Sequence, residues 1–265
     1  MRYLITILML LAAAVTTAAH EYWFEPETFF PSVGGNTVVH LYVGDGLIKD
    51  GEERKFELEK TPMFKVFSQR KTLDLLGVLV AGATPIYQFS ADAAGNYLLG
   101  MERNWSYIKI EPEKFEAYLS EDGIDYIIAE REKLGERKKE GRERYSRFIK
   151  SLLQVGDKRD DQYKRKLGLK LELIPLENPY SKKIGDTITF QLLFDGKPAV
   201  GRTVFADNRE AETQKMVTDS HGKFSFKVSK SGLWLARLVI MQRCKADCGE
   251  ADWESFWGAF SFGVK

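Results

Sequence analysis

The pattern of hydrophobic and polar residues divides the chain into four ranges. Residues 1–19 contain an apolar run from Tyr3 to Val15, followed by small residues up to Ala19. This run is shorter than the roughly 20 residues that a membrane-spanning helix needs. A short apolar run followed by small residues is typical of a secretory signal peptide. We therefore expect cleavage after Ala19 and a periplasmic protein that starts at His20 and has no transmembrane segment in its mature chain.

Short alternating runs occupy the two longest ranges of the mature chain. Residues 20–111 include such runs at 37–46 and 85–101, and residues 167–265 contain further runs separated by Gly, Asn, Asp and Pro. A period of two between turn residues is the pattern of half-buried antiparallel strands. The sequence therefore predicts a mainly β chain with two antiparallel β-sandwich domains of the immunoglobulin or transthyretin kind.

The range between them, residues 112–166, has the pattern of helices. Pro112 suits the first turn of a helix, and Gly123 marks a break between two helices. Four hydrophobic residues further on recur at the spacing of one helix face: Tyr145, Phe148, Ile149 and Leu152. Residues 131–150 also carry nine basic and four acidic side chains, which would form either a solvated helix face or a contact for an anionic surface. We expect a charged helical insert between the two β domains.

The composition excludes several classes of protein. The chain has 39 Lys and Arg against 38 Asp and Glu, with 44% hydrophobic residues, which argues against disorder and against a polybasic nucleic-acid binder. Three His and two Cys among 265 residues leave few side chains for metal or nucleophilic chemistry. The sequence contains no G-x-S-x-G, no H-E-x-x-H and no phosphate-binding glycine loop. We therefore expect a protein that is not an enzyme.

Several segments resemble a known family. They are HEYWFEP at the mature start, GLKLELIPLENPYSKKIGDTITF with the DGKPAVG turn that follows, VTDSHGKFSFKV, and the closing ADWESFWGAFSF. Over nearly the whole mature chain, the sequence is similar to an exported family of unknown-function domains labelled as nickel-uptake-associated, after the periplasmic subunit of nickel and cobalt transport complexes. The resemblance implies a non-enzymatic accessory protein that binds a transition metal ion and works with an inner- or outer-membrane transporter component.

The expected new N-terminus is the first candidate for metal chemistry. After cleavage, the amine and the Nδ1 of His20 can bind one ion together, and a second imidazole would complete the site. His40 is the candidate partner, because residues 20–30 and 36–43 are expected to form adjacent strands. Such nitrogen ligands suit nickel, cobalt or copper without selecting among them. The alternatives are a polar N-terminus for His20, a hydrogen-bonded strand histidine for His40, and an ordinary turn residue for His221.

The two cysteines are close in the sequence. Cys244 and Cys248 lie in one predicted loop, and in an oxidising compartment such a pair is expected to form a disulfide that closes the tip of a hairpin. The alternative is a pair of thiolates that binds a soft metal, with Asp247 or Glu250 as a further ligand.

Two functions from different classes follow. The first is a periplasmic metal-binding accessory protein. The second is a structural or interaction module in which the sandwiches and the helical insert bind an envelope protein or a glycan. Trp253 and Trp257 bear on the second, because residues an even number apart face the same way on a strand. They would form either a binding platform or part of the core.

Overall fold

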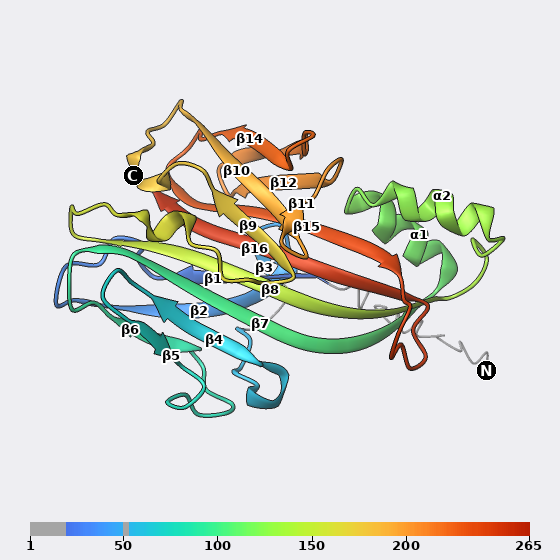
Figure 1. Cartoon of the computed structure of the whole chain (residues 1–265), viewed down its shortest axis with the longest axis horizontal. Helices are drawn as coiled ribbons and strands as arrows, with labels where there is room; N and C mark the ends of the chain where they lie inside the picture. Colours follow the sequence, from blue (N-terminus) through green and yellow to red (C-terminus); the bar gives the residue numbers. More distant parts are fainter. Residues whose placement is uncertain (1–19, 50–52) are drawn as a thin grey trace, which may run out of the picture.

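The described part of the chain folds into three β-sheets, with two α-helices at one end (Figure 1). The computed structural model describes residues 20–49 and 53–265. The predicted signal peptide, residues 1–19, lies outside the described residues. Strands dominate the described part of the chain, so the predicted mainly β class is confirmed.

The largest sheet has eight strands and forms the middle layer of the fold. Its strands are β4 (Met63–Phe67), β5 (Thr72–Asp74), β7 (Gly95–Ile110), β8 (Gly141–Val155), β12 (Thr203–Asn208), β13 (Ala211–Val217), β15 (Gly232–Arg243) and β16 (Trp253–Val264). They lie in the order β13, β12, β15, β16, β8, β7, β4, β5. Neighbours are antiparallel except β8 and β16, which are parallel. All three predicted parts contribute strands to this sheet, so two separate sandwiches are not confirmed.

Two smaller sheets cover opposite faces of the large sheet. One contains β1 (Glu21–Pro26), β2 (Asn36–Asp45), β3 (Ile48–Lys49) and β6 (Tyr87–Ser90), and the other contains β9 (Leu171–Pro175), β10 (Thr187–Phe194), β11 (Lys197–Pro198) and β14 (Lys223–Lys227). On β16, Ser261 Oγ donates to the Phe24 carbonyl of β1 at 2.7 Å. The adjacent Phe260 packs edge-on against Phe190 of β10, with ring centres 5.4 Å apart. Because successive residues of a strand point to opposite faces, the result is a three-layered sandwich.

The predicted helical insert is correct at its start and wrong at its end. α1 (Pro112–Glu121) begins at the expected proline, and Gly123, at φ 66°, separates it from α2 (Asp125–Lys133). Residues 141–155 form β8 instead of the predicted helix. Both faces of β8 are covered, so nearly all its residues are buried and no period of two remains in its sequence. Three short 3-10 helices complete the fold: η1 (Leu58–Lys60), η2 (Asp161–Lys164) and η3 (Pro179–Ser181).

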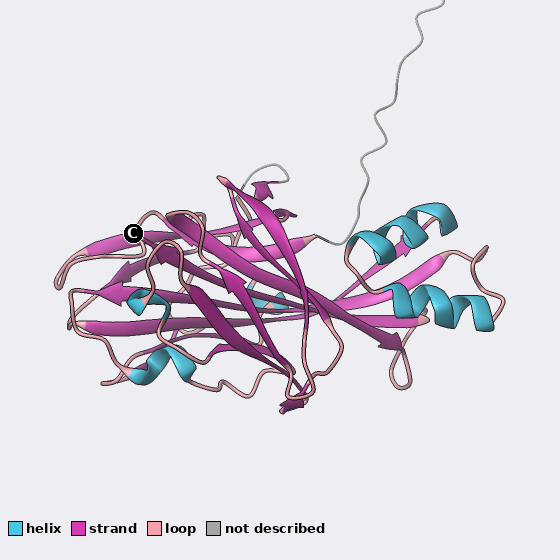
Figure 2. Ribbon diagram, turned by 90° about the horizontal axis from the view of Figure 1, so that it is seen from above, coloured by secondary structure: helices cyan, strands magenta, loops and turns pink. Residues whose placement is uncertain are grey.

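The two helices pack on one end of the large sheet (Figure 2). Trp253 and Trp257 face them from β16 and are buried, with the Tyr118 ring stacked on Trp257 at 5.9 Å. These tryptophans therefore belong to the core and form no exposed platform. The Tyr126 hydroxyl of α2 donates to the Met241 carbonyl and accepts from the Met241 N–H, each at 3.0 Å. The Tyr126 hydroxyl thus satisfies both backbone hydrogen-bonding groups of Met241, as a neighbouring strand would.

The disulfide prediction is confirmed. Cys244 and Cys248 are bridged in the loop between β15 and β16. No helix in the part of the chain that the structure describes is both long enough and apolar enough to cross a membrane.

Candidate metal site and the charged clusters around it

The two candidate histidines lie on adjacent strands but far apart. β1 and β2 pair as predicted, with Glu25 opposite His40 and Glu21 opposite Gly44. His20 precedes Glu21, so it lies five residues, or roughly 17 Å, along the sheet from the position opposite His40. In this arrangement the two imidazoles cannot share one ion. Within residues 20–49 and 53–265, no group of three or more His, Cys, Asp or Glu side chains is placed to hold one metal ion together.

His40 lies between two carboxylates. Its Nδ1 is 2.9 Å from Glu53 Oε2, and its Nε2 is 3.8 Å from Glu27 Oε1. An ionised carboxylate only accepts hydrogen bonds, so Nδ1 donates to Glu53, and in the neutral ring Nε2 keeps its lone pair. The His40 and Glu53 side chains are 22% and 15% exposed, against 61% for Glu27. The nitrogen that can bind a ligand therefore faces a solvent-exposed carboxylate.

An aromatic ladder holds the His40 ring. The ring stacks on Tyr42 at 5.7 Å, and Tyr42 in turn contacts Trp23 of β1 at 6.0 Å. Lys49 Nζ lies 3.5 Å from the centre of the Tyr42 ring on the same side of the sheet. His40 and Tyr42 are two residues apart and share the half-buried face of β2, while Leu41 between them is in the core. The ring is thus fixed on a strand, which gives a more precise site than a loop would.

The second carboxylate oxygen of Glu53 is left over in the described part of the fold. Glu53 Oε1 is buried and has no hydrogen-bond partner among the residues that the structure describes. Glu27 and Glu53 were both missed by sequence reasoning, because neither has a fixed spacing from His40 and both reach it only through the folded chain. Their residue type gives no signal in a sequence with 38 acidic side chains.

His20 lies beside β8, away from the His40 cluster. Its carbonyl accepts two hydrogen bonds from Arg147, from Nε at 3.2 Å and from Nη2 at 3.0 Å. The Arg147 guanidinium also lies 4.0 Å from the centre of the Tyr22 ring. The start of β1 is therefore fastened to the large sheet by its backbone. His221 lies in the exposed turn before β14, as predicted, where its N–H donates to Asp219 at 2.8 Å.

One buried arginine meets four carboxylates beside the start of β1. Arg237 of β15 pairs with Glu21 and with Asp207, the latter at 2.6 Å, and it lies 3.6 Å from Asp122 and 3.7 Å from Asp45. Burial raises the pKa of Glu21 and raises that of Asp122 well above its ordinary value. The cluster joins β1, β2, β12, β15 and the end of α1. The cluster is a structural junction in which the Arg237 guanidinium is the cation that faces all four carboxylates.

A second buried carboxyl group lies under the helices. Glu143 of β8 accepts hydrogen bonds from Ser255 Oγ and from the Tyr118 hydroxyl, the latter at 3.2 Å. Its Oε2 is buried without a hydrogen-bond partner in the described ranges. Burial raises the pKa of Glu143 to about 7, against the lowering effect of these two hydrogen bonds. Glu143 thus exchanges a proton near neutral pH at the contact between α1 and the sheet.

Glu143 makes the stability of the protein dependent on pH. The folded state holds the proton up to about pH 7, while the unfolded chain releases it near 4.5. The stabilisation from this group is therefore complete below about pH 4.5 and is lost as the pH rises to 7. Glu143→Gln cannot release this proton, so we expect the variant to keep its stability where the wild type loses it. The difference in unfolding free energy, variant minus wild type, should therefore rise by about 3 kcal/mol between pH 4 and pH 8. Urea unfolding at both pH values measures the difference.

Glu113→Gln on the same helix pair is the matched control, because Glu113 of α1 is exposed. Its difference from wild type should be the same at both pH values. Equal pH dependence in wild type and Glu143→Gln would show that Glu143 does not control this behaviour.

Comparison with known proteins places the chain in a family without assigning it a ligand. No curated protein matches the sequence. The family model described as "Domain of unknown function (DUF4198)" matches residues 17–242, which include both candidate histidines, β8 and most of β15. Because this match covers most of the 265 residues, the chain belongs to that family of domains of unknown function.

Proposed function

We propose that this chain is a periplasmic, non-catalytic accessory protein that binds a transition metal ion at His40 and passes it to a membrane transporter component. The observation that carries the proposal is the His40 ring, with one nitrogen bonded to Glu53 and the other facing Glu27. Metal-binding histidines commonly donate their other ring N–H to a carboxylate, which fixes the tautomer and the ring orientation. In this assignment His40 Nε2 and Glu27 are the ligands, and Glu53 orients the ring.

The spacing of these atoms suits a shared ion. The 3.8 Å between His40 Nε2 and Glu27 Oε1 is longer than a hydrogen bond. Two ligand atoms that each lie about 2 Å from one tetrahedral ion are about 3.3 Å apart, so a small rotation of the exposed Glu27 side chain would bring both atoms onto one ion. Imidazole and carboxylate ligands suit nickel, cobalt, copper and zinc, and two protein ligands leave other positions for water or for a partner's ligand. An open site of this kind suits a cargo ion that must be released.

The cellular location in the proposal rests on two observations. The first 19 residues have the pattern of a secretory signal, and the two cysteines are bridged. Disulfides persist in oxidising compartments such as the periplasm and are rare in the cytosol. The transporter partner and the choice of nickel or cobalt rest on the sequence resemblance alone.

Metal titration of single variants tests the proposal. Ni(II), Co(II) and Cu(II) would be titrated into the mature protein by calorimetry, with His40→Ala, Glu27→Gln and Glu53→Gln measured in parallel. We expect wild type to bind one ion, His40→Ala to lose this binding, and Glu53→Gln to bind about 10–100-fold more weakly, as is typical for a residue that orients a ligand. His221→Ala, which removes an exposed turn histidine, should bind like wild type.

Two results would contradict the proposal. Binding that survives in His40→Ala but is lost in His20→Ala would place the site at the N-terminus. A dissociation constant of about 100 μM corresponds to a binding free energy of about 5.5 kcal/mol. If none of the three ions binds more tightly than this, the result would favour the alternative, an interaction module that binds an envelope protein or a glycan.

A further inference from the structure

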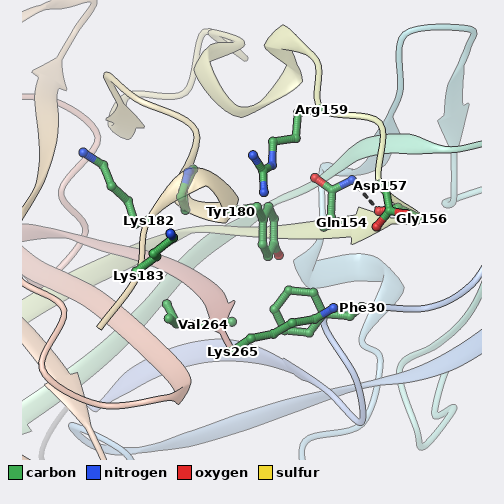
Figure 3. Close-up of a pocket in the computed structure, with 12 residues that line it drawn as sticks. Phe30, Gln154, Gly156, Asp157, Arg159, Tyr180, Lys182, Lys183, Val264 and Lys265 are labelled. Carbon is green, nitrogen blue, oxygen red and sulfur yellow. Dashed lines mark hydrogen bonds between the residues drawn. The ribbon is translucent and has the colours of Figure 1, made fainter. Parts of the chain in front are cut away.

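A cavity lies beside the end of β16, at the end of the large sheet away from the helices (Figure 1), and Figure 3 shows the residues that line it. It has a volume of about 350 Å³ and lies where the turn after β8, the 3-10 helix η3 and the end of β16 meet. Tyr180 forms its centre, and Phe30 packs edge-on against Tyr180 with ring centres 5.3 Å apart. The Tyr180 hydroxyl donates to the Leu152 carbonyl of β8. The aromatic wall of the cavity is therefore fixed by the core.

The rim of the cavity is basic. Among the lining residues, one side chain is acidic, that of Asp157, and four are cationic: Arg159, Lys182, Lys183 and Lys265. Lys182 lies 3.7 Å from Glu177, and Lys265 Nζ lies 4.6 Å from the centre of the Phe30 ring. Within residues 20–49 and 53–265, no carboxylate pairs with Arg159 or Lys183 at 4.0 Å or less. The whole chain has a net charge of only +1, so this excess is local. Clefts lined by one sign of charge concentrate ligands of the opposite sign.

Side-chain amides, of which Asn96 and Gln154 are buried, hold the two loops that carry the cations. Gln154 Nε2 donates to the Gly156 carbonyl at 2.9 Å and to the Lys158 carbonyl at 2.7 Å, which shapes the turn before Arg159. Asn178 Oδ1 accepts from the Tyr180 N–H at 3.0 Å at the start of η3. Asn96 joins the two loops, since its Nδ2 donates to Gln154 at 2.9 Å and its Oδ1 accepts from Asn178 at 2.8 Å. The cationic rim is thus pre-organised by a network that the metal proposal does not use.

We propose that this cavity binds a small phosphate-bearing ligand, of the size of a monosaccharide phosphate. Its volume falls at the lower end of the 300–1,000 Å³ typical of small-molecule sites. Several separate cations favour a doubly charged phosphate over a single carboxylate, and the planar guanidinium of Arg159 matches phosphate oxygens. Tyr180 and Phe30 supply the apolar wall for a sugar ring. The phosphate could belong to a soluble sugar phosphate or to a lipid headgroup, and the test distinguishes these sources.

Charge reversal at the rim tests this proposal in metal-free buffer. Glucose 1-phosphate, inorganic phosphate, and phosphatidylcholine vesicles containing phosphatidylglycerol are the probes. Binding of the soluble probes is measured by NMR titration, and vesicle binding by co-sedimentation. The Arg159→Glu/Lys183→Glu variant is compared with Lys133→Glu/Lys138→Glu, which makes the same charge change at exposed positions beside the helices. We expect wild type and the control to bind a phosphate probe at about 1 mM or tighter, and the rim variant to bind at least tenfold more weakly.

The outcomes separate clearly. Binding of glucose 1-phosphate with shifts at Gly156 and Lys182 supports a soluble ligand, and vesicle binding lost only in the rim variant supports a lipid headgroup. Equal losses in both double variants would show that net charge alone is responsible and would overturn the proposal. The absence of binding by every probe to wild type would also overturn it. Thermal melting of both variants verifies that these exposed substitutions leave the fold intact.

Discussion

Lys150→Met is expected to destabilise the protein by about 3–5 kcal/mol. Lys150 of β8 and Glu172 of β9 form a buried ion pair between the large sheet and the sheet above it, and their side chains are 1% and 2% exposed. Lys150 Nζ donates to Glu172 Oε1 at 2.9 Å, to the Leu173 carbonyl at 3.1 Å and to the Arg165 carbonyl at 3.3 Å. The substitution removes all three donors and leaves a carboxylate buried without its cation.

The large effect comes from the charge that remains. Both side chains are almost fully buried, so solvent is excluded from this site, and this burial lowers the pKa of Lys150. Glu172 also accepts from the Leu167 N–H at 2.6 Å and the Gly168 N–H at 3.1 Å, so the carboxylate cannot move to solvent without releasing that turn. Removing one partner of a buried pair costs more than replacing both. The double variant Lys150→Met/Glu172→Gln should therefore be more stable than Lys150→Met alone.

Denaturant unfolding measures both variants. Lys65→Met is the control, because Lys65 forms an exposed ion pair with Asp74 at 3.1 Å. Exposed pairs contribute about 0–1 kcal/mol, so the control should be close to wild type. A loss below about 1 kcal/mol in Lys150→Met would mean that this pair does not stabilise the contact between the sheets.

Arg237→Met is expected to cost a similar 3–5 kcal/mol at pH 7.5, because it leaves Glu21 and Asp207 buried without a cation. The loss should depend on pH. Arg237 lowers the pKa of Glu21 against the raising effect of burial, so without the guanidinium the pKa of Glu21 in the folded state rises further above its value in the unfolded chain. The folded state then binds protons more tightly, and the stability of the variant falls as the pH rises above about 4.

The comparison of pH 4.5 with pH 7.5 tests that account. Arg237→Met should lose less stability, relative to wild type, at pH 4.5 than at pH 7.5. Arg209→Met serves as the control, because Arg209 pairs with Glu25 at 2.7 Å and its own side chain is exposed. A loss of equal size at both pH values would indicate that packing of the arginine side chain, and not its charge, holds the junction.

Local sequence patterns predicted the parts of the fold that depend on near neighbours. The alternation in residues 37–46 predicted β2, the expected pairing of residues 20–30 with 36–43 matches that of β1 with β2, and Pro112 and Gly123 marked the limits of α1. The disulfide was predictable because Cys244 and Cys248 lie four residues apart in one loop. In each case the physical cause lies within a few residues of the signal.

Features that depend on distant partners were not predictable. β8 is covered on both faces by layers that come from other parts of the chain, so residues on both of its faces are buried. Its sequence therefore has no alternation of apolar and polar residues, and the spacing of its apolar residues matched that of a helix face. The pairing of Arg237 with Glu21 joins residues 216 apart. The candidate site shows the same limit. His40 stood out because the chain has only three histidines, but the register that separates it from His20 appears only in the folded sheet.

Nitrogen-15 NMR of the three imidazole rings tests the metal proposal most directly. The sequence has only three histidines, His20, His40 and His221, so each ring gives its own pair of nitrogen signals. Diamagnetic Zn(II) is the probe, since it takes the same ligand types. Our account predicts that Zn(II) shifts the Nε2 signal of His40, while Nδ1 stays protonated by its bond to Glu53. Saturation with Zn(II) that leaves the His40 Nε2 signal unchanged would contradict it.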